Sequence, residues 1–580
     1  MNVRTPHIAE QRRGFVLVIV MLVIAMISLA GLSYVWTLST ENKATHLHGD
    51  QLQLEQTLTS GQEYVRAVCA GTWEQRRELG DVLDNETLFR QIVVDCDAEG
   101  SRQARFSVLS PQTQQPDAQG HRYGLQDESA KLNLAVFQQW ELAEQGAAEQ
   151  ALTGLPGMTE PVAAAILDWI DADTTPRASG AEAKYYAGQG LPYVPRDGVP
   201  ASLEELLLVR DVSRYQMFGG DTDRNYQVDS YELQAASGPS GGTGGGQPWA
   251  RMLTVYSAER NVTCSGQKRI NVNQGDLQEL HDRLSEAFDA QWATFIVAYR
   301  QFGPLEEEGA SLLGTARGPS RGRPRTQASS RLAAMRGDIE MPKLDLSMPA
   351  EFRIDSIYDL IDARVSLPAE EIGRQRRSMR GSGPQRKTTR SRPRDPRFTD
   401  DTGPPTPPIL ESPFASELAE MGQYLPALLD RLALDDAEVI RGRINIQRAP
   451  REVIAAIPGI DSDIVDRILS ARMSHENDDI ATLRHCVWLA SDEIMDIEEL
   501  RRLSPYITGG GDVFRCQIVA ALDNSRQIAR AEVVIDATAN PPRQLYWKDL
   551  GMLGPGFSPD VVGAIAADSE SAGELGPPPD

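Results

Sequence analysis

The stretch FVLVIVMLVIAMISLAGL, residues 15–32, decides how this chain is organised, because it contains no charged residue. At about 1.5 Å per residue, a helix of this length spans roughly 27 Å, close to the hydrocarbon thickness of a bilayer. Only fourteen residues precede it, and they end in Arg12, Arg13 and Gly14. The paired arginines predict a single membrane pass with the N-terminus in the cytoplasm and the bulk of the chain on the other side.

A secretory signal peptide is the alternative interpretation of the same run. Its cleavage site would place small residues directly after the apolar stretch, whereas residues 33–36 read SYVW. We therefore expect the segment to be retained. A helical pattern continues beyond it and predicts one apolar stripe that packs on a sheet. The stripe consists of Leu47, Leu54, Leu58, Gly61, Val65 and Val68.

The composition indicates a globular protein of several domains. The chain has 580 residues, of which 41% are hydrophobic and 24% are charged, and this length allows more than one core. Its formal net charge of -24 makes nucleic acid an unlikely partner for the whole molecule and favours divalent cations. The five cysteines show no metal-binding spacing, and Cys69 with Cys96 are the candidates for a disulfide bond in an oxidising compartment. The sequence contains no GxSxG, HExxH or GxxxxGK[ST] motif, so we predict no enzymatic activity.

Strand-like segments occur at both ends of the part that follows the long helix. Residues 89–96 and 105–109 form the early group, and residues 514–522, 527–536 and 544–547 form the late group. We predict an α+β fold, in which the N-terminal helix packs on a small antiparallel sheet. This sheet begins early in the chain, is interrupted by inserted helical domains, and is completed at the end.

Two Pro-Gly turns between helical patterns predict helix-hairpin-helix units. They lie at residues 155–158 (LPGM) and 457–460 (IPGI). Ser202 and Glu205 are spaced as a capping box that opens a further helix. The segment RINVN at residues 269–273 recurs as RINIQ at residues 443–447. In both copies the asparagine, Asn271 or Asn445, is expected to cap a helix start.

An acidic segment at residues 221–232 has the spacing of an EF-hand calcium loop. Oxygen-bearing residues occupy loop positions 1, 3, 5, 9 and 12, and position 7 supplies a backbone carbonyl. These residues are Asp221, Asp223, Asn225, Asp229 and Glu232, with Gln227 at position 7. Tyr226 stands where glycine normally makes the sharp turn, and a positive φ there costs about 1 kcal/mol or more. We expect a structural Ca²⁺ site, and the alternative is a solvated acidic turn.

A second candidate for metal binding follows the first hairpin. Asp171 and Asp173 precede a Gly-Ala-Glu sequence that ends at Glu182. Their carboxylates are either calcium ligands or caps at the end of a helix.

The junction Arg-Arg-Gly-Phe resembles the cleavage site of type IV prepilins and pseudopilins. In that family a membrane prepilin peptidase cuts after the glycine, here Gly14, and the new terminus, here Phe15, is methylated. Most members carry glutamate as the fifth mature residue, but this chain has Ile19. The absence of that glutamate is typical of the minor pseudopilin called protein K of the type II secretion system. A subunit without this glutamate has no buried carboxylate that needs a partner on a neighbouring subunit, which suits a position at the fibre tip.

Four longer segments extend the resemblance to protein K. Residues 123–134 (YGLQDESAKLNL) resemble its DESxKLNLN segment, and residues 169–186 resemble its WxDxD…GAEDxYY stretch. Residues 445–475 are similar to its ComEA-like hairpin domain, and residues 533–551 to its C-terminal end. Relatives in this family bind calcium in their helical domain.

The resemblance implies a minor pseudopilin of the bacterial inner membrane with its bulk in the periplasm. It would cap the tip of the pseudopilus and aid the export of folded proteins across the outer membrane. The implied partners are other minor pseudopilins, the pseudopilus, the prepilin peptidase and the inner membrane, and contact with secreted cargo is a further hypothesis. Two alternatives remain open at this stage: a type IV pilus minor subunit, and a ComEA-like helix-hairpin-helix DNA-binding protein.

These observations divide the chain into seven regions. The first three are a prepilin leader (1–14), a transmembrane or pilin helix with the first strands (15–135), and a helical domain with the first hairpin and the acidic loop (136–236). The fourth region (237–440) is a Gly-rich linker with largely disordered basic, Pro-rich insertions around an ordered segment at 250–300. The last three are a second helix-hairpin-helix domain (441–510), C-terminal strands that complete the sheet (511–553), and a disordered tail (554–580).

Overall fold

The computed structural model describes most of the chain outside the segments predicted to be unstructured. The described residues are 13–96, 103–112, 120–236, 247–305, 344–368, 409–475, 478–523, 525 and 527–563. Within the region predicted to hold the basic, Pro-rich insertions (237–440), residues 306–343 and 369–408 lie outside the described residues. The same is true of residues 1–12 of the leader, 237–246 of the linker and 564–580 of the tail.

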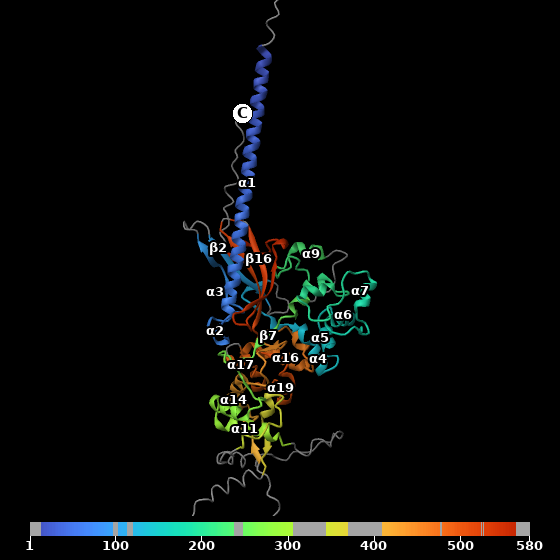
Figure 1. Cartoon of the computed structure of the whole chain (residues 1–580), viewed down its shortest axis with the longest axis vertical. Coiled ribbons are helices and arrows are strands. Elements are labelled where there is room, and N and C mark those ends of the chain that lie inside the picture. Colours follow the sequence, from blue (N-terminus) through green and yellow to red (C-terminus); the bar gives the residue numbers. More distant parts are fainter. Residues whose placement is uncertain are drawn as a thin grey trace, which may run out of the picture.

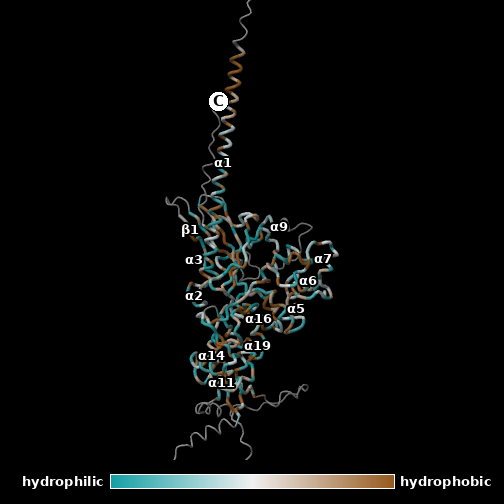
Figure 2. Tube along the Cα trace, in the orientation of Figure 1, coloured by the Kyte–Doolittle hydropathy of each residue, from teal (hydrophilic) through white to brown (hydrophobic). Residues whose placement is uncertain are grey.

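A single long helix, α1 (Arg13–Cys69), extends away from the body of the molecule (Figure 1). Its outer part is strongly apolar and exposed (Figure 2), with a mean hydropathy of 3.0 in its most apolar window. It is the one helix among the described residues that is long and apolar enough to cross a membrane.

The inner part of α1 packs on the sheet by the predicted apolar stripe. Leu54, Leu58 and Val65 are buried, whereas Leu47 is exposed because it lies beyond the edge of the sheet. At Gly61 the helix approaches the sheet so closely that a Cβ atom would lie 2.7 Å from the Ile518 side chain.

The sheet confirms the prediction that both ends of the chain build it. Its strand order is β1-β2-β15-β16-β17, and all of these pairings are antiparallel. The early strand β2 lies directly beside the late strand β15, with Val108 opposite Ile518. Phe89, which was predicted to begin a strand, instead ends the short helix α3 (Glu86–Phe89). The strands are β1 (Ile92–Cys96), β2 (Gln103–Pro111), β15 (Val513–Leu522), β16 (Ile528–Asp536) and β17 (Arg543–Asp549), with β3 (His121–Tyr123) and β4 (Gln126–Asp127) added at β2 and β15.

A first helical unit lies beside the sheet (Figure 1). It contains the first predicted hairpin, in which α5 and α6 flank Gly157 at φ +71°. The predicted capping box is wrong, because Ser202 makes no capping hydrogen bond and a short 3-10 helix follows it. Glu205 accepts from the Ala201 amide and the Trp169 indole instead. The elements are α4 (Phe137–Ala143), α5 (Ala147–Thr153), α6 (Glu160–Ile170), α7 (Ala183–Gly188), η3 (Leu203–Leu208), α8 (Arg214–Phe218) and α9 (Ser230–Ala236).

A second helical unit forms the end of the body that is farther from α1 (Figure 1). One continuous apolar core joins it to the first unit, from Ala130 to Ile507. The second predicted hairpin lies here, between α15 and α16, with Gly459 at φ +70°. The helices are α10 (Leu277–Ala287), α11 (Ala290–Phe302), α14 (Leu418–Arg431), α15 (Arg451–Ala455), α16 (Ser462–Ala471), α17 (Ile480–Arg484), α18 (Trp488–Ser491) and α19 (Ile497–Leu503).

The RINVN/RINIQ repeat has a structural counterpart, and the structure adds a third copy. In each copy a two-residue strand pairs in parallel with a distant one, and the asparagine Oδ1 accepts the N–H two residues ahead. Asn271 and Asn445 therefore stabilise turns rather than helix starts, because α10 and α15 begin several residues later. The third copy centres on Asn133. The paired strands are β5 (Leu132–Asn133) with β6 (Leu253–Thr254), β8 (Ile270–Asn271) with β11 (Leu432–Ala433), and β13 (Ile444–Asn445) with β14 (Ile507–Thr508).

Candidate metal sites and the DES motif

The predicted EF-hand segment forms a tight loop between α8 and α9. Tyr226 has φ +70°, so the residue at the glycine position adopts the conformation that this position requires. Carboxylate oxygens of Asp221, Asp223 and Glu232 lie within 4.8 Å of one another. The loop therefore brings three of the six predicted ligands together.

Backbone amides hold these carboxylates in place. Glu232, which is 2% exposed, accepts from the N–H and the hydroxyl of Thr222, both at 2.6 Å. Burial raises the pKa of Asp221 to about 6. At Glu232 burial is outweighed by the hydrogen bonds, which lower its pKa instead. Three carboxylates held this close together are chemically suited to a divalent cation.

The other predicted ligands point elsewhere. The Asn225 amide nitrogen donates to Asp229 (3.1 Å) and to the Gly556 carbonyl (3.1 Å), while its oxygen accepts the Gln227 N–H at 2.8 Å. Asn225, Gln227 and Asp229 thus form a neighbouring hydrogen-bonded group rather than part of the acidic triad.

The acidic loop is attached to the sheet through its backbone carbonyls. Arg530 of β16 donates to the Asp223 carbonyl at 2.5 Å, and Gln517 of β15 donates to the Arg224 carbonyl at 2.7 Å. The Arg224 guanidinium lies 3.9 Å from the centre of the Phe218 ring. The loop therefore contacts both central strands, β15 and β16, directly.

The second candidate cluster has carboxylate oxygens without donors. Oxygens of Asp171, Asp173 and Glu182 lie within 4.8 Å of one another. Glu182 is 4% exposed, and neither of its carboxylate oxygens has a hydrogen-bond partner among the described residues, nor does Oδ1 of Asp171. Asp171 also pairs with Arg177. Burial raises the pKa values of both Asp171 and Glu182.

The buried Glu182 carboxylate, which lacks donors, fits a cation with oxygen ligands. Asp173 is exposed and accepts the Thr175 N–H at 2.7 Å, which is the contact of a capping side chain. Glu182 was not counted as a ligand from the sequence. The Gly-Ala-Glu sequence that follows Asp171 and Asp173 placed Glu182 near these residues. The spacing could not show that the Glu182 side chain is buried.

A third acidic cluster is unsuited to a metal. Cys264, Asp430 and His485 are equally close to one another, but a guanidinium nitrogen of Arg269 lies 3.3 Å from His485 Nε2. The positive charge of Arg269 opposes a second cation at this nitrogen. Cys69 is also a free, buried cysteine, so it forms no disulfide with Cys96, whose side chain lies outside the described residues.

The DES segment at residues 127–129 connects the sheet to the second helical unit. Asp127, 4% exposed, accepts from the Gly511 amide (2.9 Å) and from the Asn445 side chain (2.8 Å). Glu128, which is fully buried, pairs with Lys131 (2.7 Å) and with Arg515 of β15 (2.8 Å). The same short segment therefore holds the sheet and the second hairpin together.

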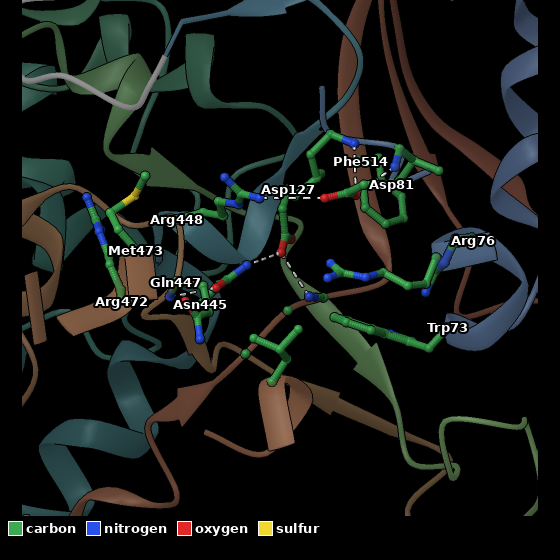
Figure 3. Close-up of a pocket in the computed structure, with 17 residues that line it drawn as sticks. Trp73, Arg76, Asp81, Asp127, Asn445, Gln447, Arg448, Arg472, Met473 and Phe514 are labelled. Atoms are coloured by element: carbon green, nitrogen blue, oxygen red, sulfur yellow. Dashed lines mark hydrogen bonds and ion pairs between the residues drawn. The ribbon is translucent and has the colours of Figure 1, made fainter. Parts of the chain in front are cut away.

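A cavity of about 100 Å³ lies beside this junction. Asp127 and Asn445 point toward each other at its wall, and Trp73 and Arg76 of α2 (Trp73–Glu78) close the opposite side (Figure 3). Arg76 forms a buried ion pair with Asp512 at 2.5 Å, so the polar side chains here serve mainly to join the units.

The predicted processing residues lie at the start of α1. Gly14 is the second residue of the helix, Phe15 is 70% exposed, and Ile19 is 45% exposed. The geometry leaves the predicted cleavage at this junction untested.

Comparison with protein families gives one match. Residues 130–217 match the family described as type II secretion system (T2SS), protein K. The matched segment contains the first hairpin and the Asp171, Asp173 and Glu182 cluster. A search of curated proteins returns no match.

Proposed function

Because residues 130–217 assign the chain to the protein K family of the type II secretion system, we propose that it is a minor pseudopilin that caps the tip of the pseudopilus. The single observation that carries this proposal is the match of the helical unit to that family. The exposed apolar helix α1 supports anchoring in the inner membrane, with the body in the periplasm and other pseudopilins packed around the helix. Its role is structural, and it serves the export of folded proteins.

Processing at Gly14 is part of this proposal. In cells with an active prepilin peptidase, the mature protein should begin at Phe15 and carry one methyl group. Substitution Gly14→Val should leave the leader attached, because a side chain would obstruct the extended chain in the protease. Mass spectrometry of the membrane-extracted protein measures both. A mature terminus beyond Trp36 would contradict the proposal.

The shape of the body supports the proposed position at the tip. The two helical units extend beside and beyond the sheet (Figure 1), which makes the subunit broad for the middle of a fibre. A photo-crosslinking residue at Leu22, 58% exposed on α1, should capture neighbouring pseudopilins. The same residue at Met473, 57% exposed on the second unit, should not capture the major pseudopilin. Equal capture at both positions would place the subunit within the shaft.

Deletion of the gene separates secretion from pilus function. Export of folded enzymes should fail while twitching motility is retained. The opposite result would favour a type IV pilus subunit. DNA binding has less support, because Asp461 and Asp463 lie at the start of α16 in the second hairpin, where they repel phosphate.

We further propose that both acidic clusters bind Ca²⁺ as structural ions. The unpartnered oxygens of Glu182 and Asp171 support the second cluster, and the spacing and φ of the Asp221 loop support the first. Binding to the folded state alone stabilises a protein by about 2.7 kcal/mol at a hundredfold excess of ligand over Kd.

The calcium proposal predicts opposite effects of one substitution in two buffers. In EDTA, Glu182→Gln should raise the melting temperature or leave it unchanged, because it removes a buried carboxylate without donors. In Ca²⁺ the wild-type melting temperature should rise more than that of the variant. Glu160→Gln, on an exposed position of α6, is the matched control and should follow the wild type. Equal Ca²⁺ shifts in wild type and Glu182→Gln would exclude this cluster, and Asp221→Asn tests the other loop separately.

A further inference from the structure

The RINVN and RINIQ copies of the repeat converge on one cavity of about 180 Å³. Arg269 begins the RINVN copy and Arg443 begins the RINIQ copy, and both line this cavity together with Arg484 at the end of α17. Hydroxyl groups of Ser356, Ser504 and Thr508 complete its polar wall. Asp435, which is exposed, is the one carboxylate among the described lining residues.

Several guanidinium groups at this wall are incompletely bonded. Arg484 is 1% exposed and donates from Nη2 to the Arg260 carbonyl at 2.9 Å. Its Nε and Nη1 have no partner among the described residues, and the same is true of Arg443 Nε. Unsatisfied donors on a buried cation are costly unless an acceptor fills the space in front of them.

The nearby carboxylates are already engaged. Glu259 pairs with Arg443 at 3.1 Å and accepts from Thr508 at 2.9 Å. Asp430 accepts from the Cys264 amide at 2.9 Å and lies 3.0 Å from His485 Nε2. Arg269, 7% exposed, reaches only the backbone carbonyl of Asp430, the Asn261 side chain and His485. Among the described residues, neither Arg269 nor Arg484 makes a direct ion pair with a carboxylate. Burial alone would lower the pKa of Arg484, but the charges of Asp512 and Glu259 nevertheless raise it.

We propose that this cavity binds a small tetrahedral oxyanion, inorganic phosphate or sulfate. An arginine guanidinium group donates two parallel hydrogen bonds to such an anion, and the hydroxyl groups supply further donors. The cavity volume of about 180 Å³ is large enough to admit an anion of this size. Because Arg269 and Arg484 are almost fully buried, the ligand is a free ion rather than a group on a macromolecule.

The test uses the purified full-length chain in detergent. Phosphate, sulfate and acetate are titrated against chloride at constant ionic strength, with isothermal calorimetry and thermal unfolding as readouts. Phosphate or sulfate should bind saturably and raise the melting temperature, and acetate should bind more weakly. Arg443→Gln should weaken binding by about tenfold or more, in line with the loss of one charge-assisted bond.

Arg441→Gln is the matched control, because Arg441 lies two residues away at the exposed end of β12 (Val439–Arg441). It should bind as the wild type does. Arg443 is suited to this test because its side chain is 26% exposed, so its replacement disturbs folding less than that of Arg484. Absence of saturable binding, equal affinities of the two variants, or acetate binding as tightly as sulfate would each overturn the proposal.

Discussion

Gly442 illustrates how a single backbone position fixes the junction between units. It has φ +74°, and a Cβ atom there would collide with the Val136 side chain. Gly442→Ala should therefore lower the free energy of unfolding by about 2–4 kcal/mol, from the positive φ and from overpacking. Gly422 lies inside α14 with nothing within 4 Å of the position of its Cβ, so Gly422→Ala should stabilise by about 0.5–1 kcal/mol. Chemical denaturation of the two variants measures this difference in sign.

Glu128 controls an acid-dependent part of the stability. Burial alone would raise its pKa, but the charges of Arg515 and Lys131 outweigh burial and lower the pKa to about 2. The ionised form is thus favoured in the folded state. Its contribution is complete above the unfolded pKa of 4.5 and is lost as the pH falls from 4.5 toward 2.

Glu128→Gln should cost about 3 kcal/mol at pH 7, because it leaves two buried cations with less compensation. It should also flatten the stability profile between pH 4.5 and 2. Denaturation at a series of pH values checks both effects. Glu86→Gln is the control, since Glu86 makes a largely exposed pair with Arg90, and it should change stability by less than about 1 kcal/mol. A Glu128→Gln profile as steep as the wild type would assign the acid sensitivity to other carboxylates.

At the scale of elements, the contact between α1 and the sheet depends on a few buried side chains. Leu58 is 5% exposed, whereas Leu52, on the same helix, is 48% exposed. Leu58→Ala should lower the free energy of unfolding by about 2–5 kcal/mol, and Leu52→Ala by less than about 0.5 kcal/mol. Thermal unfolding of the detergent-solubilised protein measures the two. Similar losses of unfolding free energy in the two variants would mean that α1 packs on the sheet by a different face.

Elements with a strong period were predictable, and those fixed by distant partners were not. The stripe from Leu54 to Val65 has helical spacing, and the strand pattern of residues 514–522 is local, so both appear in the sequence. The copy of the repeat at Asn133 was missed because only a basic residue and the asparagine are shared. Its two-residue strand exists through pairing with Leu253, more than a hundred positions away. Likewise, the candidate metal ligands were found by spacing, but the burial of Glu182 and the hydrogen bond that Asn225 donates to the Gly556 carbonyl depend on tertiary contacts.

At the scale of the whole molecule, the acidic loop links the first helical unit to the sheet through Arg530. This side chain is fully buried, and it joins the Asp223 carbonyl at 2.5 Å to the Gly554 carbonyl at 3.0 Å. If the loop binds Ca²⁺, the ion should order carbonyls that β16 holds directly. Protection should therefore spread from residues 221–232 into residues 513–536.

Hydrogen exchange measured by mass spectrometry, with and without Ca²⁺, tests this coupling. In the wild type, Ca²⁺ should slow exchange in both segments. In Arg530→Gln it should slow exchange in the loop alone, because the variant lacks the guanidinium that bridges the two. Arg543→Gln is the matched control, since Arg543 lies in β17 of the same sheet with its side chain 59% exposed, and it should retain protection in both. If Ca²⁺ still protects the strands in Arg530→Gln, the loop and the sheet are coupled by another contact, such as Gln517. If Ca²⁺ does not slow exchange in the wild-type loop, the proposed Ca²⁺ site in this loop is wrong.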